Sequence, residues 1–138
     1  MNDKIFIDSN IFLYAFTQKD IQKHSVAQNI IMEPLSISIQ VINEVSKNML
    51  YKFAFSNKNI LDFINDAYIK YKVFDVNRDV FIKAVEFRTK YNVSYYDSII
   101  LSTAYSNCCD IIYSEDLQNN QIFFAKLKVV NPFCSIKC

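Results

Sequence analysis

The chain has 138 residues, of which 51% are hydrophobic, and we expect a single domain over residues 1–138. Its 15 basic and 14 acidic side chains leave a net charge of +1, so composition shows none of the basic excess that most nucleic-acid-binding domains carry. The chain contains no glycine. P-loops, GxGxxG dinucleotide turns and GxSxG nucleophile elbows all depend on glycine, so the usual motifs of those classes are excluded.

Short apolar runs rich in β-branched residues alternate with longer segments of helical period, which is typical of an α/β domain built on a parallel sheet. The strands that we expect, in chain order, are 4–7, 35–39, 73–76, 110–113 and 127–130. The helices that we expect are 10–16, 21–32, 40–53, 58–71, 77–91 and 95–107. The last helix is apolar around almost its whole circumference, which predicts burial on most sides.

Nothing in the sequence indicates a membrane segment or a secretory signal. No window approaches the roughly 18 uninterrupted apolar residues of a membrane span, and the first ten residues lack the basic-then-apolar layout of a signal peptide. We therefore expect a cytoplasmic protein. The four cysteines, at positions 108, 109, 134 and 138, lack the paired spacing of a zinc site, so we expect reduced structural thiols.

Acidic residues recur where the expected strands end. Asp8 directly follows the first strand, Asp116 lies shortly after the fourth, and Glu44 lies early in the helix after the second. Because ligands bind at the carboxyl edge of an open parallel sheet, these side chains are expected to converge there, and Asp97 in the last helix can supply a fourth. Two carboxylates about 4 Å apart repel by roughly 4 kcal/mol at an effective dielectric constant of about 20, so such a cluster needs a neutralising cation or proton. All-oxygen ligands suit Mg²⁺ or Mn²⁺, as one or two ions.

Each of these residues also has a simpler interpretation. Ser94 and Asp97 fit a helix capping box, Asp116 fits the start of a turn, and Asn10 fits a helix cap. Glu44 fits an ordinary solvated position on a helix. Taken singly, the simpler interpretation competes with or outweighs a metal-binding role, so the prediction depends on the joint placement of the four acids.

Four short motifs stand in order along the chain: FIDSNI at 6–11, NEV at 43–45, YDSII at 96–100 and IYSEDL at 112–117. With these motifs the sequence resembles PIN domains, and especially the VapC-type toxins of prokaryotic toxin–antitoxin pairs. The closing VNPF at 130–133 is also similar to the last strand of that family. The resemblance extends nearly from end to end.

The resemblance implies a three-layer α/β/α sandwich with a central, mainly parallel sheet of about five strands. It implies a Mg²⁺- or Mn²⁺-dependent endoribonuclease with an RNA substrate, a VapB-like antitoxin partner and, more weakly, a homodimer. Metal-binding and catalytic roles are implied for Asp8, Glu44, Asp97 and Asp116. Orienting roles around them are implied for Ser9, Asn10 and Ser114.

The chain departs from the family pattern after the last acidic motif, where a glycine is common. Asparagine tolerates left-handed backbone better than most residues, so we expect Asn119 or Asn120 to form the turn there. Glu115 leaves an alternative open, because it could share or replace the role of Asp116. The family pattern favours Asp116.

Several residues outside the motifs are weaker candidates. Lys19, Lys23, Lys47 and Lys52 are candidate phosphate contacts, although solvated helix faces explain them more simply. His24, the only histidine, lies on no motif, so a surface or packing role is favoured over a general base.

An aromatic-rich stretch, residues 49–55 followed by the helix 58–71, is the predicted docking groove for the antitoxin, with core packing as the alternative. Two other functions compete with a toxin. One is a PIN-like nuclease of RNA processing or DNA repair, and the other is a non-catalytic PIN-like scaffold that binds RNA or protein. The complete set of four acids argues against the scaffold.

Overall fold

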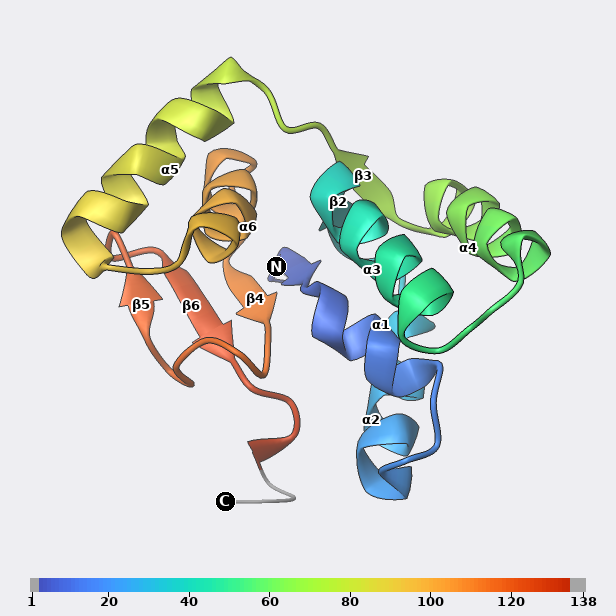
Figure 1. Cartoon of the computed structure of the whole chain (residues 1–138). Coiled ribbons are helices and arrows are strands. Elements are labelled where there is room, and N and C mark those ends of the chain that lie inside the picture. Colours follow the sequence, from blue (N-terminus) through green and yellow to red (C-terminus); the bar gives the residue numbers. More distant parts are fainter. Residues whose placement is uncertain (1–2, 135–138) are drawn as a thin grey trace.

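The computed structural model describes residues 3–134, which form six helices and six strands (Figure 1). In chain order the elements are β1 (Ile5–Ile7), α1 (Ser9–Ala15), α2 (Ile21–Ile31), β2 (Ser36–Ser38), α3 (Ile39–Tyr51), α4 (Asn57–Lys70), β3 (Lys72–Phe74), α5 (Arg78–Tyr91), α6 (Tyr95–Ser106), β4 (Ile111–Tyr113), β5 (Ile122–Phe123) and β6 (Leu127–Val130). The predicted fold class, a three-layer α/β/α sandwich around a mainly parallel sheet, is confirmed. All six expected helices and all five expected strands are present.

The strands form one sheet in the order β3-β2-β1-β4-β6-β5. All neighbours pair in parallel except β5, which runs antiparallel to β6 at the edge. This sixth strand was not predicted, because a pair of residues is too short to show a period. From β1 the sheet grows through β2 and β3 in one direction and through β4 and β6 in the other, so β1 and β4 flank the topological switch point where ligands bind in such folds.

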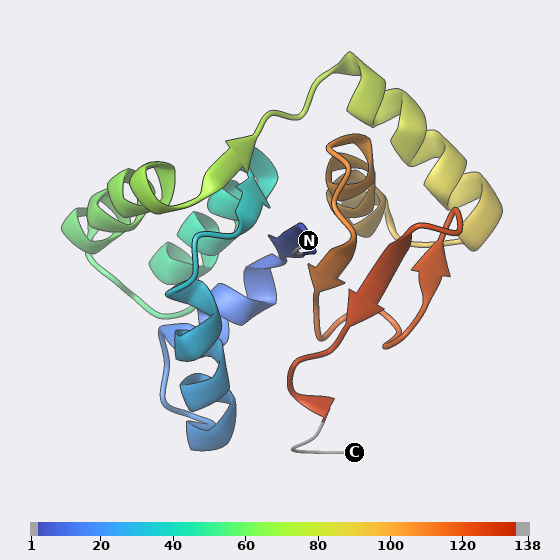
Figure 2. The ribbon, with the colours of Figure 1, turned by 180° about the vertical axis from the view of Figure 1, so that it is seen from behind.

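The helices divide between the two halves of the sheet. Figure 1 and the reverse view in Figure 2 show α1 to α4 gathered around β1, β2 and β3, whereas α5 and α6 lie beside β4, β5 and β6. The central strands are fully buried at Phe6, Ile7, Ile37 and Ile112, as expected for parallel strands that are covered on both faces. The acids that follow these strands therefore extend from a buried central sheet.

Helix α6 is buried over its whole middle part, from residue 98 to residue 104, as its apolar circumference predicted. Its first turn is different, because the side chains of Tyr95 and Tyr96 are 54% and 61% exposed. Asp97, next in the chain, is half-buried at the point where α6 enters the core.

Six residues of the described chain adopt positive φ without being glycine: Ala54, Asn92, Cys108, Asn120, Phe124 and Ala125. Asn92 caps the end of α5 in the left-handed conformation. Asn120, at φ 69°, forms the turn after the last acidic motif, which confirms the expectation for that residue. At the alanine and phenylalanine positions the left-handed backbone costs stability that a glycine would not.

The expectation of reduced thiols is correct for Cys108 and Cys109 but wrong for Cys134, which is disulfide-bonded. Cys138 lies outside the described residues. Over residues 3–134, no helix combines the length and apolar character needed to cross a membrane.

Candidate metal centre

Asp8 lies at the switch point of the sheet, directly after β1. Its backbone N–H donates to the carbonyl of Tyr113, 3.0 Å away, which ties the end of β1 to the end of β4. The side chain caps α1 and is only 4% exposed: its carboxylate accepts hydrogen bonds from the Ser9 N–H at 2.7 Å and the Ser114 hydroxyl at 2.8 Å. The pKa of Asp8 is raised to about 6. Burial is the main cause and the charges of Asp116 and Asp97 add to it, whereas the two hydrogen bonds lower the pKa.

Asn10 links Asp8 to Asp116. Its side-chain amide donates to Asp116 Oδ2 at 3.1 Å and lies 3.5 Å from Asp8 Oδ2. The Ser114 hydroxyl completes the link, because it donates to Asp8 and accepts from the backbone N–H of Asp116 at 3.2 Å. These contacts bring together residues that are more than a hundred positions apart in the chain, and they leave the Asp116 side chain exposed.

Asp97 lies in the first turn of α6. The hydroxyl of Ser94 accepts its backbone N–H at 3.2 Å, so the capping role of Ser94 is confirmed. Capping does not remove Asp97 from the acidic site. Burial raises the pKa of Asp97, a hydrogen bond with the Ser94 side chain lowers it, and the charge of Asp116 raises it again.

Glu44 projects from α3 into a cavity of about 280 Å³ that it shares with Lys47 and Tyr96. One of its carboxylate oxygens, Oε1, is buried and accepts no hydrogen bond from the described residues. Burial raises the pKa of Glu44 to about 7, and the charges of Asp8 and Asp97 add to the effect. A buried carboxylate oxygen without a donor is an acceptor that a cation or a proton would satisfy.

The pKa values of Asp8, Glu44 and Asp97 are therefore all raised, and the charge of Asp116 contributes to each rise, so the sheet brings the four acids to one region. Within residues 3–134, however, no three His, Cys, Asp or Glu side chains are already arranged around a single point as metal ligands. The donor chemistry fits Mg²⁺ or Mn²⁺, because every candidate ligand is a carboxylate oxygen. The repulsion among the acids and the unpartnered Glu44 oxygen both favour a cation, and completing its shell requires side chains to turn inward.

Glu115 is separated from the acidic site, although it neighbours Asp116. Its carboxylate forms an ion pair with Lys23 and accepts a hydrogen bond from the hydroxyl of Tyr14. The alternative that Glu115 replaces Asp116 therefore finds no support in the geometry. The interpretation of Lys23 as a phosphate contact is wrong, because its side chain is 3% exposed and is turned toward Glu115.

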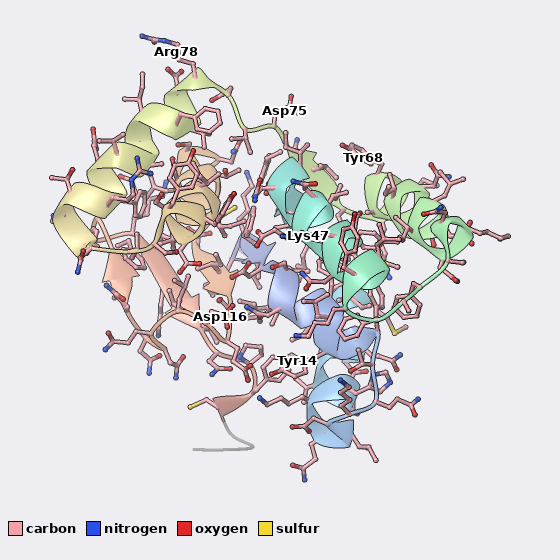
Figure 3. All side chains as sticks on the ribbon, in the orientation of Figure 1. Tyr14, Lys47, Tyr68, Asp75, Arg78 and Asp116 are labelled. Atoms are coloured by element: carbon pink, nitrogen blue, oxygen red, sulfur yellow. The ribbon has the colours of Figure 1, made fainter. Side chains whose placement is uncertain are left out.

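The other lysines and the histidine named from the sequence differ in how exposed their side chains are. Lys19, Lys47 and Lys52 are exposed, and Lys47 also lines the cavity of Glu44. His24 is half-buried, with Nδ1 3.1 Å from the carbonyl oxygen of Tyr14, so it packs between α1 and α2 and not in the acidic site. Figure 3 shows Lys47 on α3, with Asp116 on the connection that follows β4.

Sequence reasoning did not identify two residues near the acids, Gln40 and Tyr14. Gln40 precedes Glu44 by one helical turn and hydrogen-bonds its side chain, which lowers the pKa of Glu44. The spacing of four residues along a helix could have revealed it. The contact between Tyr14 and Glu115 spans 101 positions and leaves no local signal.

The chain is similar to a known protein family and to several solved structures. The family model of the PIN domain matches residues 5–123. No curated protein matches the chain. The solved structures that it resembles include a toxin–antitoxin complex from Klebsiella pneumoniae, with 18% identity, a TM-score of 0.68, and coverage of 93% of this chain and 97% of that chain.

Two further structures are similar. VapC20 of Mycobacterium tuberculosis, described as a sarcin–ricin loop cleaving toxin, has 16% identity and a TM-score of 0.63 over 80% of this chain and 88% of its own. FitAcB from Neisseria gonorrhoeae has 14% identity and a TM-score of 0.65 over 94% of this chain and 98% of its own. At these identities the likeness concerns the fold, whereas the family model covers most of the sequence. The chain belongs to the PIN domain family.

Proposed function

We propose that this protein, as one PIN domain over residues 1–138, is a Mg²⁺- or Mn²⁺-dependent endoribonuclease and the toxin of a type II toxin–antitoxin pair. PIN domains are nucleases, and one structural neighbour is itself described as a toxin that cleaves the sarcin–ricin loop. The observation that carries the proposal is the network in which Asn10 and Ser114 hold Asp8 beside Asp116. Asp97 and Glu44 belong to the same set of acids, because the charge of Asp97 raises the pKa of Asp8 and the charges of Asp8 and Asp97 raise the pKa of Glu44.

In this proposal Asp8, Glu44, Asp97 and Asp116 hold one or two ions. A bound ion of this kind activates water and stabilises the charge that develops on a phosphate. Asn10 and Ser114 hold Asp8 close to Asp116 before an ion binds, and further side chains would turn inward to complete the shell. The exposed ammonium group of Lys47, beside Glu44, is placed to contact a neighbouring phosphate of the RNA. We expect cleavage to leave 3′-hydroxyl and 5′-phosphate ends.

Asp8→Ala and Asp97→Ala test the proposal, with cleavage of total RNA measured with and without Mg²⁺ and with far-UV circular dichroism as the check on folding. Both variants should lose metal-dependent cleavage and stay folded. Asp75→Ala is a matched control, because Asp75 is an exposed acid on the connection between β3 and α5, away from Asp116 (Figure 3). Full cleavage by both site variants would end the proposal. RNA binding without cleavage by the unchanged protein would favour the non-catalytic scaffold.

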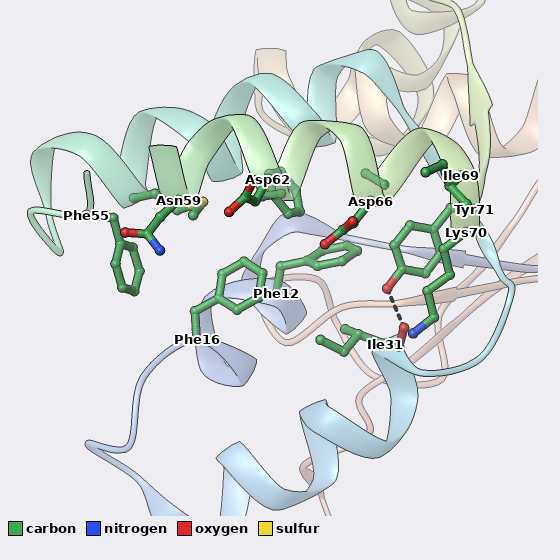
Figure 4. Close-up of a pocket in the computed structure, with 13 residues that line it drawn as sticks. Phe12, Phe16, Ile31, Phe55, Asn59, Asp62, Asp66, Ile69, Lys70 and Tyr71 are labelled. Carbon is green, nitrogen blue, oxygen red and sulfur yellow. Dashed lines mark hydrogen bonds between the residues drawn. The ribbon is translucent and has the colours of Figure 1, made fainter. Parts of the chain in front are cut away.

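The antitoxin requires a docking surface, and the structure contains an apolar groove of about 720 Å³ between α4 and the helices α1 and α2 (Figure 4). Phe12, Phe16 and Phe63 line the groove, and Phe55 lies at one end of it. The predicted stretch 49–55 thus contributes to the groove, together with α4. The lining includes none of the four acids, so a segment that fills the groove must continue beyond it to reach them.

The charges along the groove indicate what the segment carries. Asp62 and Asp66 on α4 line the groove together with Lys70, and Asp62, whose side chain is 56% exposed, pairs with Lys58. We propose that an antitoxin segment places apolar side chains in the groove and a basic side chain opposite these two acids. Co-purification with the product of the adjacent gene should be strongly weakened by Asp66→Lys and unaffected by Asp75→Lys. Unchanged co-purification with Asp66→Lys would place the antitoxin elsewhere. The predicted homodimer stays a prediction, which light scattering of the purified protein tests.

A further inference from the structure

A buried polar cluster joins α1, α2 and the loop that carries Asp116. The Lys23 ammonium group pairs with the Glu115 carboxylate and donates to the Tyr14 hydroxyl at 3.2 Å. It also lies 4.7 Å from the centre of the Tyr14 ring and 5.6 Å from that of Phe133. A buried ammonium group is strongly disfavoured without such partners, so the pair with Lys23 favours this position of Glu115.

The same loop reaches the acidic site through its neighbouring residues. The backbone N–H of Glu115 donates to Asn10 Oδ1 at 3.3 Å, and the amide of Asn10 donates in turn to Asp116. Ser114, on the other side of Glu115, donates to Asp8. The side chains of Ser114 and Asp116 therefore face the acidic site, whereas that of Glu115, between them, faces α2. Figure 3 labels Tyr14 and Asp116.

We infer that Lys23 and Tyr14 are positioning residues of the acidic site. They hold Glu115 against α2 and thereby fix residues 114–116, so that Asp116 stays within reach of Asn10 and Asp8. These positions of residues 114–116 are those of the metal-free protein, and only their effect on metal binding rests on the proposed function. A purely structural ion pair would contribute to stability alone and would leave the acidic site unchanged when it is replaced.

Lys23→Met separates these two possibilities, because it keeps much of the side-chain volume and removes the charge. The first measurement is NMR of the metal-free protein, which follows the side-chain amide of Asn10 and the carboxyl carbon of Asp116. We expect both signals to shift toward the values of side chains that have lost the hydrogen bond between Asn10 and Asp116. The second measurement is Mn²⁺ binding by calorimetry, where the dissociation constant should rise about tenfold or more, the usual size of such indirect effects.

One control and two further variants make the test decisive. Lys58→Met breaks an exposed pair with Asp62 on α4 and should change neither measurement. Tyr14→Phe removes one hydrogen bond to Glu115 and keeps the ring, so it should shift the NMR signals in the same direction even if Lys23→Met fails to fold. The double variant Lys23→Met with Glu115→Gln, which carries no charge at either position, should recover part of the lost Mn²⁺ affinity.

The two parts of the experiment fail separately. Unchanged Asn10 and Asp116 signals in a folded Lys23→Met protein, or in Tyr14→Phe where Lys23→Met is unfolded, would overturn the positioning role. A wild-type protein that binds no Mn²⁺ would contradict the proposed function, and the NMR comparison would still decide the role of Lys23.

Discussion

Replacing Asp8 by asparagine isolates the cost of placing a charge in the acidic site. Burial, with smaller effects of Asp116 and Asp97, raises the pKa of Asp8 from 3.8 to about 6, although hydrogen bonds from Ser114 and Ser9 oppose the rise. A difference of this size corresponds to about 3 kcal/mol. Because the pKa is higher in the folded state, the contribution of Asp8 to stability is fully present below about pH 4 and is lost as the pH rises through about 6.

Asparagine is neutral at every pH and has nearly the same shape, with an oxygen that can still accept from Ser114. We therefore expect metal-free Asp8→Asn to be more stable than the wild type near neutral pH, by up to about 3 kcal/mol. The difference should shrink as the pH falls toward about 4, where the wild-type carboxyl is protonated in the folded state. Urea denaturation in EDTA, followed by circular dichroism over this pH range, measures it, with Asp75→Asn as the control.

Equal stability of Asp8→Asn and the wild type near neutral pH would refute the reasoning. A difference that does not change with pH would refute it equally, because it could not arise from the ionisation of Asp8. Either result would mean that ionisation of the Asp8 carboxyl group does not destabilise the folded protein.

Three further outcomes are expected. Mn²⁺ at about ten times its dissociation constant should stabilise the wild type by about 1.4 kcal/mol in thermal unfolding and should leave Asp8→Asn unchanged; equal effects on both would place the ion elsewhere. Ser114→Ala removes a hydrogen bond that lowers the pKa of Asp8, so an NMR titration should show a higher pKa in this variant, and a lower one would contradict the geometry. Ala125→Gly should stabilise the protein by about 0.5 kcal/mol or more in urea denaturation, because its φ of 57° strains alanine, whereas Ala27→Gly, inside α2, should destabilise it.

Local patterns in the sequence are sufficient to predict most of the fold. Helices and strands follow from hydrophobic periodicity, and every predicted helix appears in the structure within two residues of its expected ends. Asn120 illustrates the same principle in a turn, because its tolerance of left-handed backbone is a property of the residue itself. The short edge strand β5 was missed because pairing with β6, and not any pattern of its own, makes it a strand.

The sequence also indicated the acids that the fold would bring together, since parallel strands end at one edge whatever their separation in the chain. The family pattern favoured Asp116, but the residue types alone left Glu115 open as an alternative, and they did not distinguish Lys23 from the exposed lysines. Lys23 lies on a helix that looks solvated at that position, and its partner is 92 residues away. Packing between distant segments determines that Asp116 faces the other acids and that Lys23 is buried against Glu115. Only the tertiary structure determines that packing, because neither the hydrophobic periodicity nor the residue types indicate which distant side chains contact each other.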